Sequence, residues 1–279
     1  MIDGVTLTDS ITRLFKAGKV ADVPVIAGAV NDEGANTAPR NATLSPSANQ
    51  IFNMTSTQIE KAISFYPVNE TFGSSAPDNF FLTEFKAYIQ SLNNFGEAGI
   101  TGSERLIGRY MSEKIGPEKV WTFRFNAPSK FLNSSSTPTL KSRVSNLTPL
   151  PAVGINYTDL SHPLSYVAHS ADNSYLQNAT AIMTDFEKAI AYEWRAYIGS
   201  FIRTGDPNSE RLANSPAWSH YGALGDFVES PVRLVPQFGF TWTSEFGNST
   251  GTQVEVSQKA QNLREEWWIS EEVLDAARL

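Results

Sequence analysis

The sequence contains no cysteine, which excludes disulfides, thiolate nucleophiles and cysteine-ligated zinc sites. It has three histidines, His162, His169 and His220, and none of them forms the H-E-x-x-H spacing of a helical zinc site. No apolar run approaches the roughly 18–20 residues that cross a bilayer. No charged segment followed by an apolar one opens the chain, so no secretory signal peptide is visible.

Basic residues are also scarce. The 22 Lys and Arg residues are outnumbered by 29 Asp and Glu residues, which gives a formal net charge of −7, and the basic residues form no cluster. Such a chain is poorly suited to binding phosphate backbones, so we expect no nucleic-acid partner. With 41% hydrophobic and 18% charged residues among its 279, the composition is that of an ordinary globular protein.

Strand-length apolar runs alternate with helical patterns, which indicates an α/β fold. The run VPVIAG at 23–28 predicts a parallel strand covered on both faces. The alternating segment at 118–128 predicts a second strand, ended by Pro128, and the segment at 233–242 predicts late extended structure. These are few strands for such a long chain. Either some strands escape notice, or the others belong to residues outside this chain.

Four segments have helical patterns. Residues 7–22 predict a short helix that ends at Gly18, and residues 79–96 and 257–277 predict two more. In the last one, Trp267 and Trp268 are expected to pack the helix onto the body of the protein. The fourth predicted helix covers 181–204, is stopped by Gly205 and has one apolar stripe: Ile182, Phe186, Ile190, Trp194, Ile198 and Ile202. The Ser-, Asn-, Thr- and Pro-rich stretch 35–60 predicts loop and a short helix, and the stretch 129–160 predicts a long loop.

The glycosylation acceptor pattern N-x-[ST] is unusually frequent. It occurs at eight positions, Asn41, Asn53, Asn69, Asn133, Asn146, Asn156, Asn178 and Asn248. Because this many acceptor sites suit a protein that passes through a secretory pathway, we expect a secreted glycoprotein whose signal peptide is not in this chain.

The apolar run at 23–30 leads directly into Asp32, Glu33 and Gly34. Taken alone, an Asp-Glu-Gly tripeptide is most often a solvated turn. Residues 1–35 as a whole, however, resemble the type-B carboxylesterase and lipase family, which is cholinesterase-like and has the α/β-hydrolase fold. The shared features are an Ile-Asp-Gly motif, a helix, a VPVI-like strand and then Asp-Glu-Gly. The resemblance implies that Glu33 is the acid of a Ser–Glu–His triad. We expect Asp32 to be a capping or solvated neighbour rather than a second catalytic acid.

The segment YVAHSADNSYLQN resembles the histidine loop of the same family, H-G-x-[ED]-x-x-[YF]. The match places His169 as the triad histidine and aligns Asp172 and Tyr175, while Ser170 stands where the family has glycine. Two interpretations of Asp172 stay open: a hydrogen-bond partner behind the catalytic pair, or an ordinary loop acid. We expect His162 to be structural and His220 to lie at the surface. The strand at 118–128 and the segment IGSFIRTGDPN at 198–208 also resemble the family, in the expected order.

The chemistry explains why an acid and a histidine belong together. A serine hydroxyl is a weak nucleophile at neutral pH, so a histidine must take its proton during attack on an ester. A carboxylate then fixes the tautomer of the histidine and stabilises the imidazolium ion. In α/β-hydrolases the chain order is nucleophile, acid, histidine, and the serine lies in a G-x-S-x-G turn. We expect no such nucleophile turn anywhere in this chain, because the nearest candidate, FGSSAP at 72–77, has Pro77 where glycine is needed.

The sequence therefore predicts a serine ester hydrolase acting on small-molecule or lipid esters, without cofactor or metal. Residues 1–279 are expected to form the C-terminal part of a single carboxylesterase domain whose nucleophile lies outside this chain, so the isolated chain should be inactive and fold poorly. The alternatives are a non-catalytic cholinesterase-like adhesion protein, a truncated relic, and an independent interaction module. Ester specificity and oligomeric state stay open.

Overall fold

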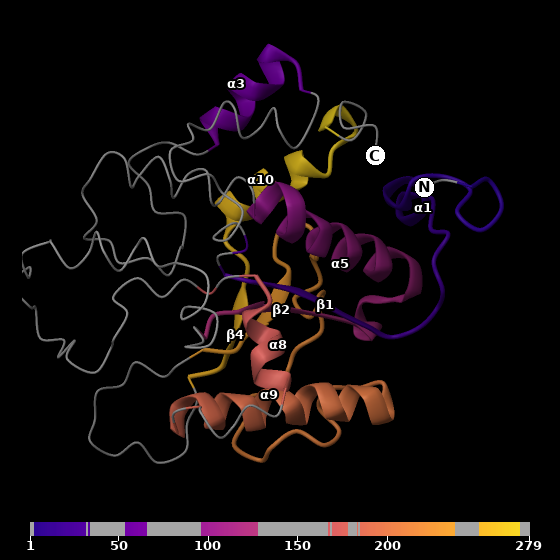
Figure 1. Cartoon of the computed structure of the whole chain (residues 1–279). Helices are drawn as coiled ribbons and strands as arrows, with labels where there is room; N and C mark the ends of the chain where they lie inside the picture. Colours follow the sequence, from indigo (N-terminus) through magenta and orange to yellow (C-terminus); the bar gives the residue numbers. More distant parts are fainter. Residues whose placement is uncertain are drawn as a thin grey trace, which may run out of the picture.

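The computed structural model describes residues 3–31, 33, 54–65, 96–127, 167, 169–177, 183, 185–237 and 251–273. Within these ranges the chain forms a four-stranded mixed sheet with helices on both faces (Figure 1). The α/β prediction is confirmed. Residues 79–95 of the helix predicted at 79–96, and the whole loop predicted at 129–160, lie outside the described residues.

The sheet has the order β1-β2-β3-β4, which is also the order along the chain. Strand β1 (Val25–Val30) pairs in parallel with β2 (Val120–Phe125), and β2 pairs in parallel with β3 (Val232–Val235). Strand β4 (Gln253–Val256) closes the sheet in the antiparallel direction. The first three strands fall where the sequence predicts them. Strand β4 was not predicted, because QVEV is only four residues long and contains no strong apolar run.

Strand β1 is less covered than its apolar sequence predicts. It lies at one edge of the described sheet, and only Ala29 and Val30 are buried while Val25–Gly28 are half-buried. Gly28 is required by the neighbouring strand. A Cβ atom at this position would lie 2.3 Å from the ring of Phe123 on β2, so only glycine allows the ring to cover β1.

Helices cover both faces of the sheet (Figure 1). On one face lie α5 (Gly102–Ile115) and α10 (Lys259–Trp268), and on the other lie α8 (Ala171–Leu176) and α9 (Asp185–Thr204). The remaining helical elements are α1 (Ile11–Lys16), α3 (Ser56–Ser64), the π-helical turn η2 (Glu97–Thr101) and the 3₁₀ turn η3 (Pro117–Lys119). The predicted stop of α1 is confirmed, since Gly18 follows its end with a positive φ of 65°.

Aromatic side chains form the core between β2 and α9. Trp194 of α9 packs against Phe123 at 4.7 Å and against Trp218 at 5.8 Å between ring centroids. Tyr175 of α8 lies 5.0 Å from Phe125. Burying each such ring contributes roughly 1.5–3 kcal/mol, so this cluster fixes α8 and α9 onto the sheet.

The predicted apolar stripe of α9 is wrong at its C-terminal end. Ile190 and Trp194 are each 1% exposed, as expected, but Ile202 is 76% exposed. Steps of four residues advance about 40° beyond a full helical turn, so a stripe built on i+4 spacing rotates out of the core after a few steps. The buried line instead continues through Tyr197, three residues after Trp194.

The two C-terminal tryptophans are buried as predicted, whereas His220 does not lie at the surface. Trp267 and Trp268 are 6% and 3% exposed and pack α10 against Met54 and Ala62, as predicted. His220 is half-buried rather than at the surface, and its Nδ1 atom is fully buried. Its neighbour Tyr221 explains this, because its backbone pairs with Val120 of β2 and with Val232 of β3.

Candidate active site

Glu33 lies just beyond the carboxyl end of β1. Asn31 still bonds to the β2 side, with its N–H 2.9 Å from the Phe125 carbonyl, so the chain leaves the sheet only after that residue. The Glu33 side chain then folds back, and its Oε1 accepts a hydrogen bond of 2.8 Å from the Val30 N–H. The residue is only 7% exposed. The end of the strand thus fixes a buried carboxylate in one orientation.

His169, which is far from Glu33 in the sequence, lies against this carboxylate. Its Nδ1 atom lies 2.6 Å from Glu33 Oε2, across 136 residues of chain. The His169 side chain is 54% exposed, whereas that of Glu33 is 5% exposed. Because the Glu33 carboxylate accepts a hydrogen bond from Nδ1–H, Nε2 is the nitrogen left to accept a proton. The pair therefore combines a fixed acid with an accessible imidazole.

Helix α8 holds the histidine in place. It begins two residues after His169, and Ala171 and Tyr175 anchor it with exposures of 1% and 0%. Between the histidine and the helix, Ser170 adopts the left-handed conformation with φ 69° and ψ 13°. It is the one residue other than glycine in the described ranges with a positive φ. The turn thus has the geometry for which glycine is the usual residue.

A cavity of about 200 Å³ opens beside the pair. Its walls come from the end of β1, from η2 and from the start of α8: Gly28, Ala29, Val30, Glu33, Ile100, His169, Ser170, Asp172 and Asn173. Burial, first of all, and the nearby negative charge of Glu33 raise the pKa of Asp172. Asp172 therefore lines the same cavity as the pair and prefers its neutral form more than a solvated acid does.

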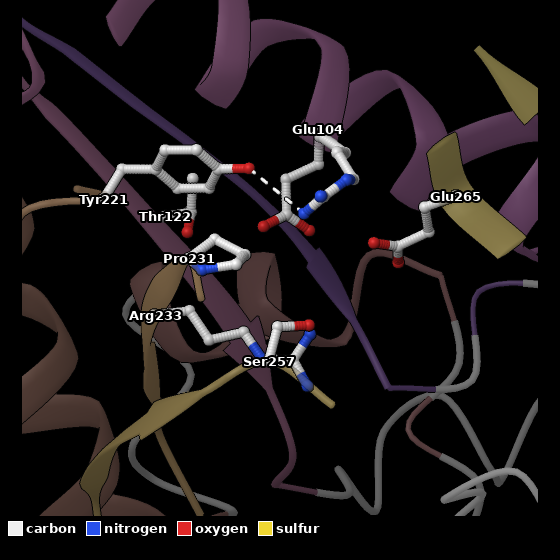
Figure 2. A pocket seen from close by; sticks show the side chains of 8 residues that line it. Glu104, Thr122, Tyr221, Pro231, Arg233, Ser257 and Glu265 are labelled. Carbon is white, nitrogen blue, oxygen red and sulfur yellow. Dashed lines mark hydrogen bonds between the residues drawn. The ribbon is translucent and has the colours of Figure 1, made fainter. Parts of the chain in front are cut away.

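A second polar cluster lies between β3 and the helices α5 and α10, and nothing in the sequence predicted it. A small cavity of about 10 Å³ lies there. Its lining includes Glu104 of α5, Arg233 of β3 and Glu265 of α10 (Figure 2). Burial, followed by the negative charge of Glu265, raises the pKa of Glu104 to about 8. Arg105 bonds to Glu266 at 2.7 Å and Arg233 to Glu255 at 2.8 Å. Only the folding of three elements together creates this cluster.

Several predicted site residues lie outside the described residues. They are Asp32, His162 and the eight glycosylation acceptor positions. Within the described ranges, no group of three or more His, Asp and Glu side chains is arranged to bind a metal ion. No helix in those ranges is both long and apolar enough to pass through a bilayer.

One G-x-S-x-G pentapeptide does occur, at Gly247–Gly251, although none precedes Glu33. It overlaps the acceptor position Asn248 and follows His169 in the chain, so it does not have the order of the α/β-hydrolase triad. A nucleophile turn also leads from a strand into a helix. Gly251 instead leads into β4, an antiparallel strand. Ser249, which lies outside the described residues, therefore does not have the chain position of the nucleophile.

A largely parallel sheet with helices on both faces, and an acid–histidine pair at the carboxyl end of a strand, define the α/β-hydrolase class. The model of the carboxylesterase family matches residues 1–229. The chain belongs to the carboxylesterase family.

Individual relatives agree with this assignment. The chain is 39% identical over 75 residues to secreted lipase 4 of Gibberella zeae, an alignment that spans 27% of this chain and 12% of that lipase. All of the chain superposes on Aspergillus niger EstA with a TM-score of 0.68 at 19% identity, and it covers 45% of that structure. A PNB esterase gives a TM-score of 0.55 at 11% identity, with 95% of this chain and 42% of that structure covered. The chain thus spans less than half the length of these solved structures.

Proposed function

We propose that this chain supplies the acid and the histidine of a serine ester hydrolase of the carboxylesterase family. The observation that carries the proposal is the contact of 2.6 Å between His169 Nδ1 and the buried Glu33 carboxylate, beside a cavity of about 200 Å³. Family membership adds to it. Residues 1–279 are, in this proposal, the C-terminal part of one carboxylesterase domain whose nucleophilic serine is contributed by residues outside this chain.

The reaction would proceed in two halves. His169 Nε2 takes the serine proton while the serine oxygen attacks the ester carbonyl, and the Glu33 carboxylate stabilises the imidazolium ion. His169 then gives that proton to the departing alcohol, which leaves an acyl-enzyme. Water attacks the acyl group with His169 again as base, releases the carboxylic acid and restores the serine.

The substrates we propose are small-molecule or lipid esters, and the site needs no metal or cofactor. The relative named a secreted lipase and the acceptor positions of the sequence both favour a secreted, glycosylated protein. Asp172, in this proposal, is a polar neighbour that supports the pair from the cavity wall.

The test is the Glu33→Gln variant of the complete protein. The amide keeps the shape and the bond from the Val30 N–H but cannot stabilise an imidazolium ion or fix its tautomer. We expect kcat for a short-chain p-nitrophenyl ester to fall about 10³–10⁴-fold with little change in KM.

The matched control is Glu118→Gln, which alters an exposed carboxylate in η3 and should keep full activity. If the complete protein hydrolyses no ester, or if Glu33→Gln is as active as the control, the proposal is wrong. A non-catalytic adhesion role or a relic would then account better for the chain.

A further inference from the structure

The π-helical turn η2 lies beside the candidate active site. It contacts β1 and runs directly into α5. The N–H of Gly102 bonds to the carbonyl of Glu97, five residues back, so the turn is one residue wider than an α-helical turn. A Cβ atom on Gly102 would lie 2.8 Å from that carbonyl oxygen, so the wide turn depends on glycine. Single π-turns inside helices occur frequently at functional sites.

The wide turn places Ile100 in the wall of the cavity that contains Glu33 and His169. Most of the other described wall residues are small or polar. Val30 is the exception, but it is 1% exposed and its side chain belongs to the core between the sheet and α9. Ile100 is half-buried. Among the described wall residues, Ile100 is therefore the one that presents a large apolar side chain to the cavity.

An ion pair between η2 and α10 fixes this turn. Two nitrogens of the Arg264 guanidinium group, Nε and Nη2, donate hydrogen bonds to the two carboxylate oxygens of Glu97 at 2.7 Å each. The side chains are 6% and 5% exposed, so the pair is shielded from water. A paired, two-pronged contact of this kind constrains geometry as well as charge. Ala98, next to Glu97, also packs against the cluster of Trp267 and Trp268.

We propose that Ile100 is a specificity-determining residue of this active site, positioned by the Glu97–Arg264 ion pair. Its side chain contacts the aliphatic part of the ester that lies next to His169 and limits the size of that part. The inference rests on the proposed function and adds a substrate preference to it: short or slender aliphatic groups fit, and bulkier ones meet Ile100. Glu97 and Arg264 act through the turn and touch no substrate.

The experiment compares Ile100→Ala and Ile100→Phe in the complete protein. Two ester series are used, p-nitrophenyl esters of acyl chains from two to eight carbons and acetate esters of alcohols of the same lengths. We expect Ile100→Ala to raise the ratio of kcat/KM for long over short chains at least 5-fold in one series, and Ile100→Phe to lower it by a similar factor. The responding series identifies the part of the ester that Ile100 contacts.

The control is Leu263→Ala, which removes an exposed apolar side chain of α10 and should leave both ratios unchanged. Ratios that stay within 2-fold of the parent in both series, for an active enzyme, overturn the inference while the proposed function stands. A parent protein without ester hydrolysis defeats the proposed function itself.

The positioning role is tested with Glu97→Asp, which keeps the charge but shortens the side chain by one methylene. We expect the long-over-short ratio to move at least 3-fold while kcat for the shortest ester stays within 3-fold of the parent. A ratio between substrates does not depend on how much protein is folded. A purely structural role would therefore lower all rates together and leave the ratio unchanged, and that result overturns the positioning role.

Discussion

At the scale of single residues, the least usual feature is the backbone of Ser170. A side chain in the left-handed region costs on the order of 1 kcal/mol, and Ser170 has φ 69° directly beside the histidine of the candidate active site. The sequence marked this position as the one departure from the histidine loop of the family. In the structure, Ser170 keeps the left-handed backbone conformation that glycine usually adopts, so this departure carries a conformational cost.

We therefore expect Ser170→Gly to stabilise the protein by about 1 kcal/mol, since it removes this strain. Chemical denaturation should show a higher midpoint with an unchanged slope. The matched control is Ser174→Gly in α8, where the backbone is helical and glycine should cost about 0.5 kcal/mol. A decrease in the midpoint for both variants would contradict the interpretation.

Glu104 is the residue whose ionisation should affect stability most clearly. Its pKa is raised by burial from 4.5 to about 8, so the folded protein binds a proton there that the unfolded chain has lost. This contribution is fully present below pH 4.5 and disappears as the pH rises to about 8. Stability should therefore fall with increasing pH across this window.

The variant Glu104→Gln stays neutral at every pH. We expect a shallower decrease of the unfolding free energy between pH 5 and pH 8, and a gain of at least about 1 kcal/mol at the upper end. Denaturation curves at several pH values test this, with the exposed Glu113→Gln of the same helix as control. A slope equal to that of the control would show that Glu104 does not hold the proton.

At the scale of elements, the turn η2 depends on one glycine and tolerates change at another. Gly102→Ala forces a Cβ atom to within 2.8 Å of the Glu97 carbonyl oxygen, so we expect it to cost about 1–3 kcal/mol of stability. Gly99 lies in the same turn with open space around its Cβ position, so Gly99→Ala should be neutral or stabilising by up to about 1 kcal/mol. Thermal unfolding of the two variants measures the difference, and equal melting temperatures would contradict it.

The elements also show where sequence periodicity is informative. Strands β1 and β2 and helix α9 were predicted because their apolar patterns are strong and local. Strand β4 was missed because it is only four residues long and none of its side chains is buried, so its sequence carries little apolar signal. The stripe on α9 was predicted correctly at Ile190 and Trp194 and wrongly at Ile202, because steps of four residues rotate progressively away from the buried face of the helix.

At the scale of the whole molecule, the isolated 279-residue chain is the sharpest test of the domain proposal. It carries no G-x-S-x-G motif before Glu33, and within the described residues no strand pairs with the outer edge of β1. We expect the purified chain to hydrolyse p-nitrophenyl butyrate no faster than its His169→Ala variant does. An exposed strand edge should also make it prone to aggregation.

The control for that experiment is Ser249→Ala, which removes the serine of the one G-x-S-x-G pentapeptide in the chain. Turnover by the isolated chain that disappears in this variant would place a nucleophile inside the chain and contradict the proposal. Turnover that survives it but needs His169 would also contradict the proposal, because the chain alone would then be sufficient for catalysis.

The sequence by itself determined the family resemblance, the α/β class, the positions of β1 and β2 and the extended structure at β3, and it predicted Glu33 and His169 as an acid–histidine pair. These properties depend on short local patterns, because strand and helix periodicity and loop motifs are encoded by residues that are close together in the sequence. Only the tertiary structure decided the 2.6 Å contact between those two residues, the burial of one and the exposure of the other. It also decided the charge cluster around Glu104 and the position of Ile100 in the cavity wall. These features depend on how β1, η2, α8 and α10 pack against one another, and the segments that meet there are far apart along the chain.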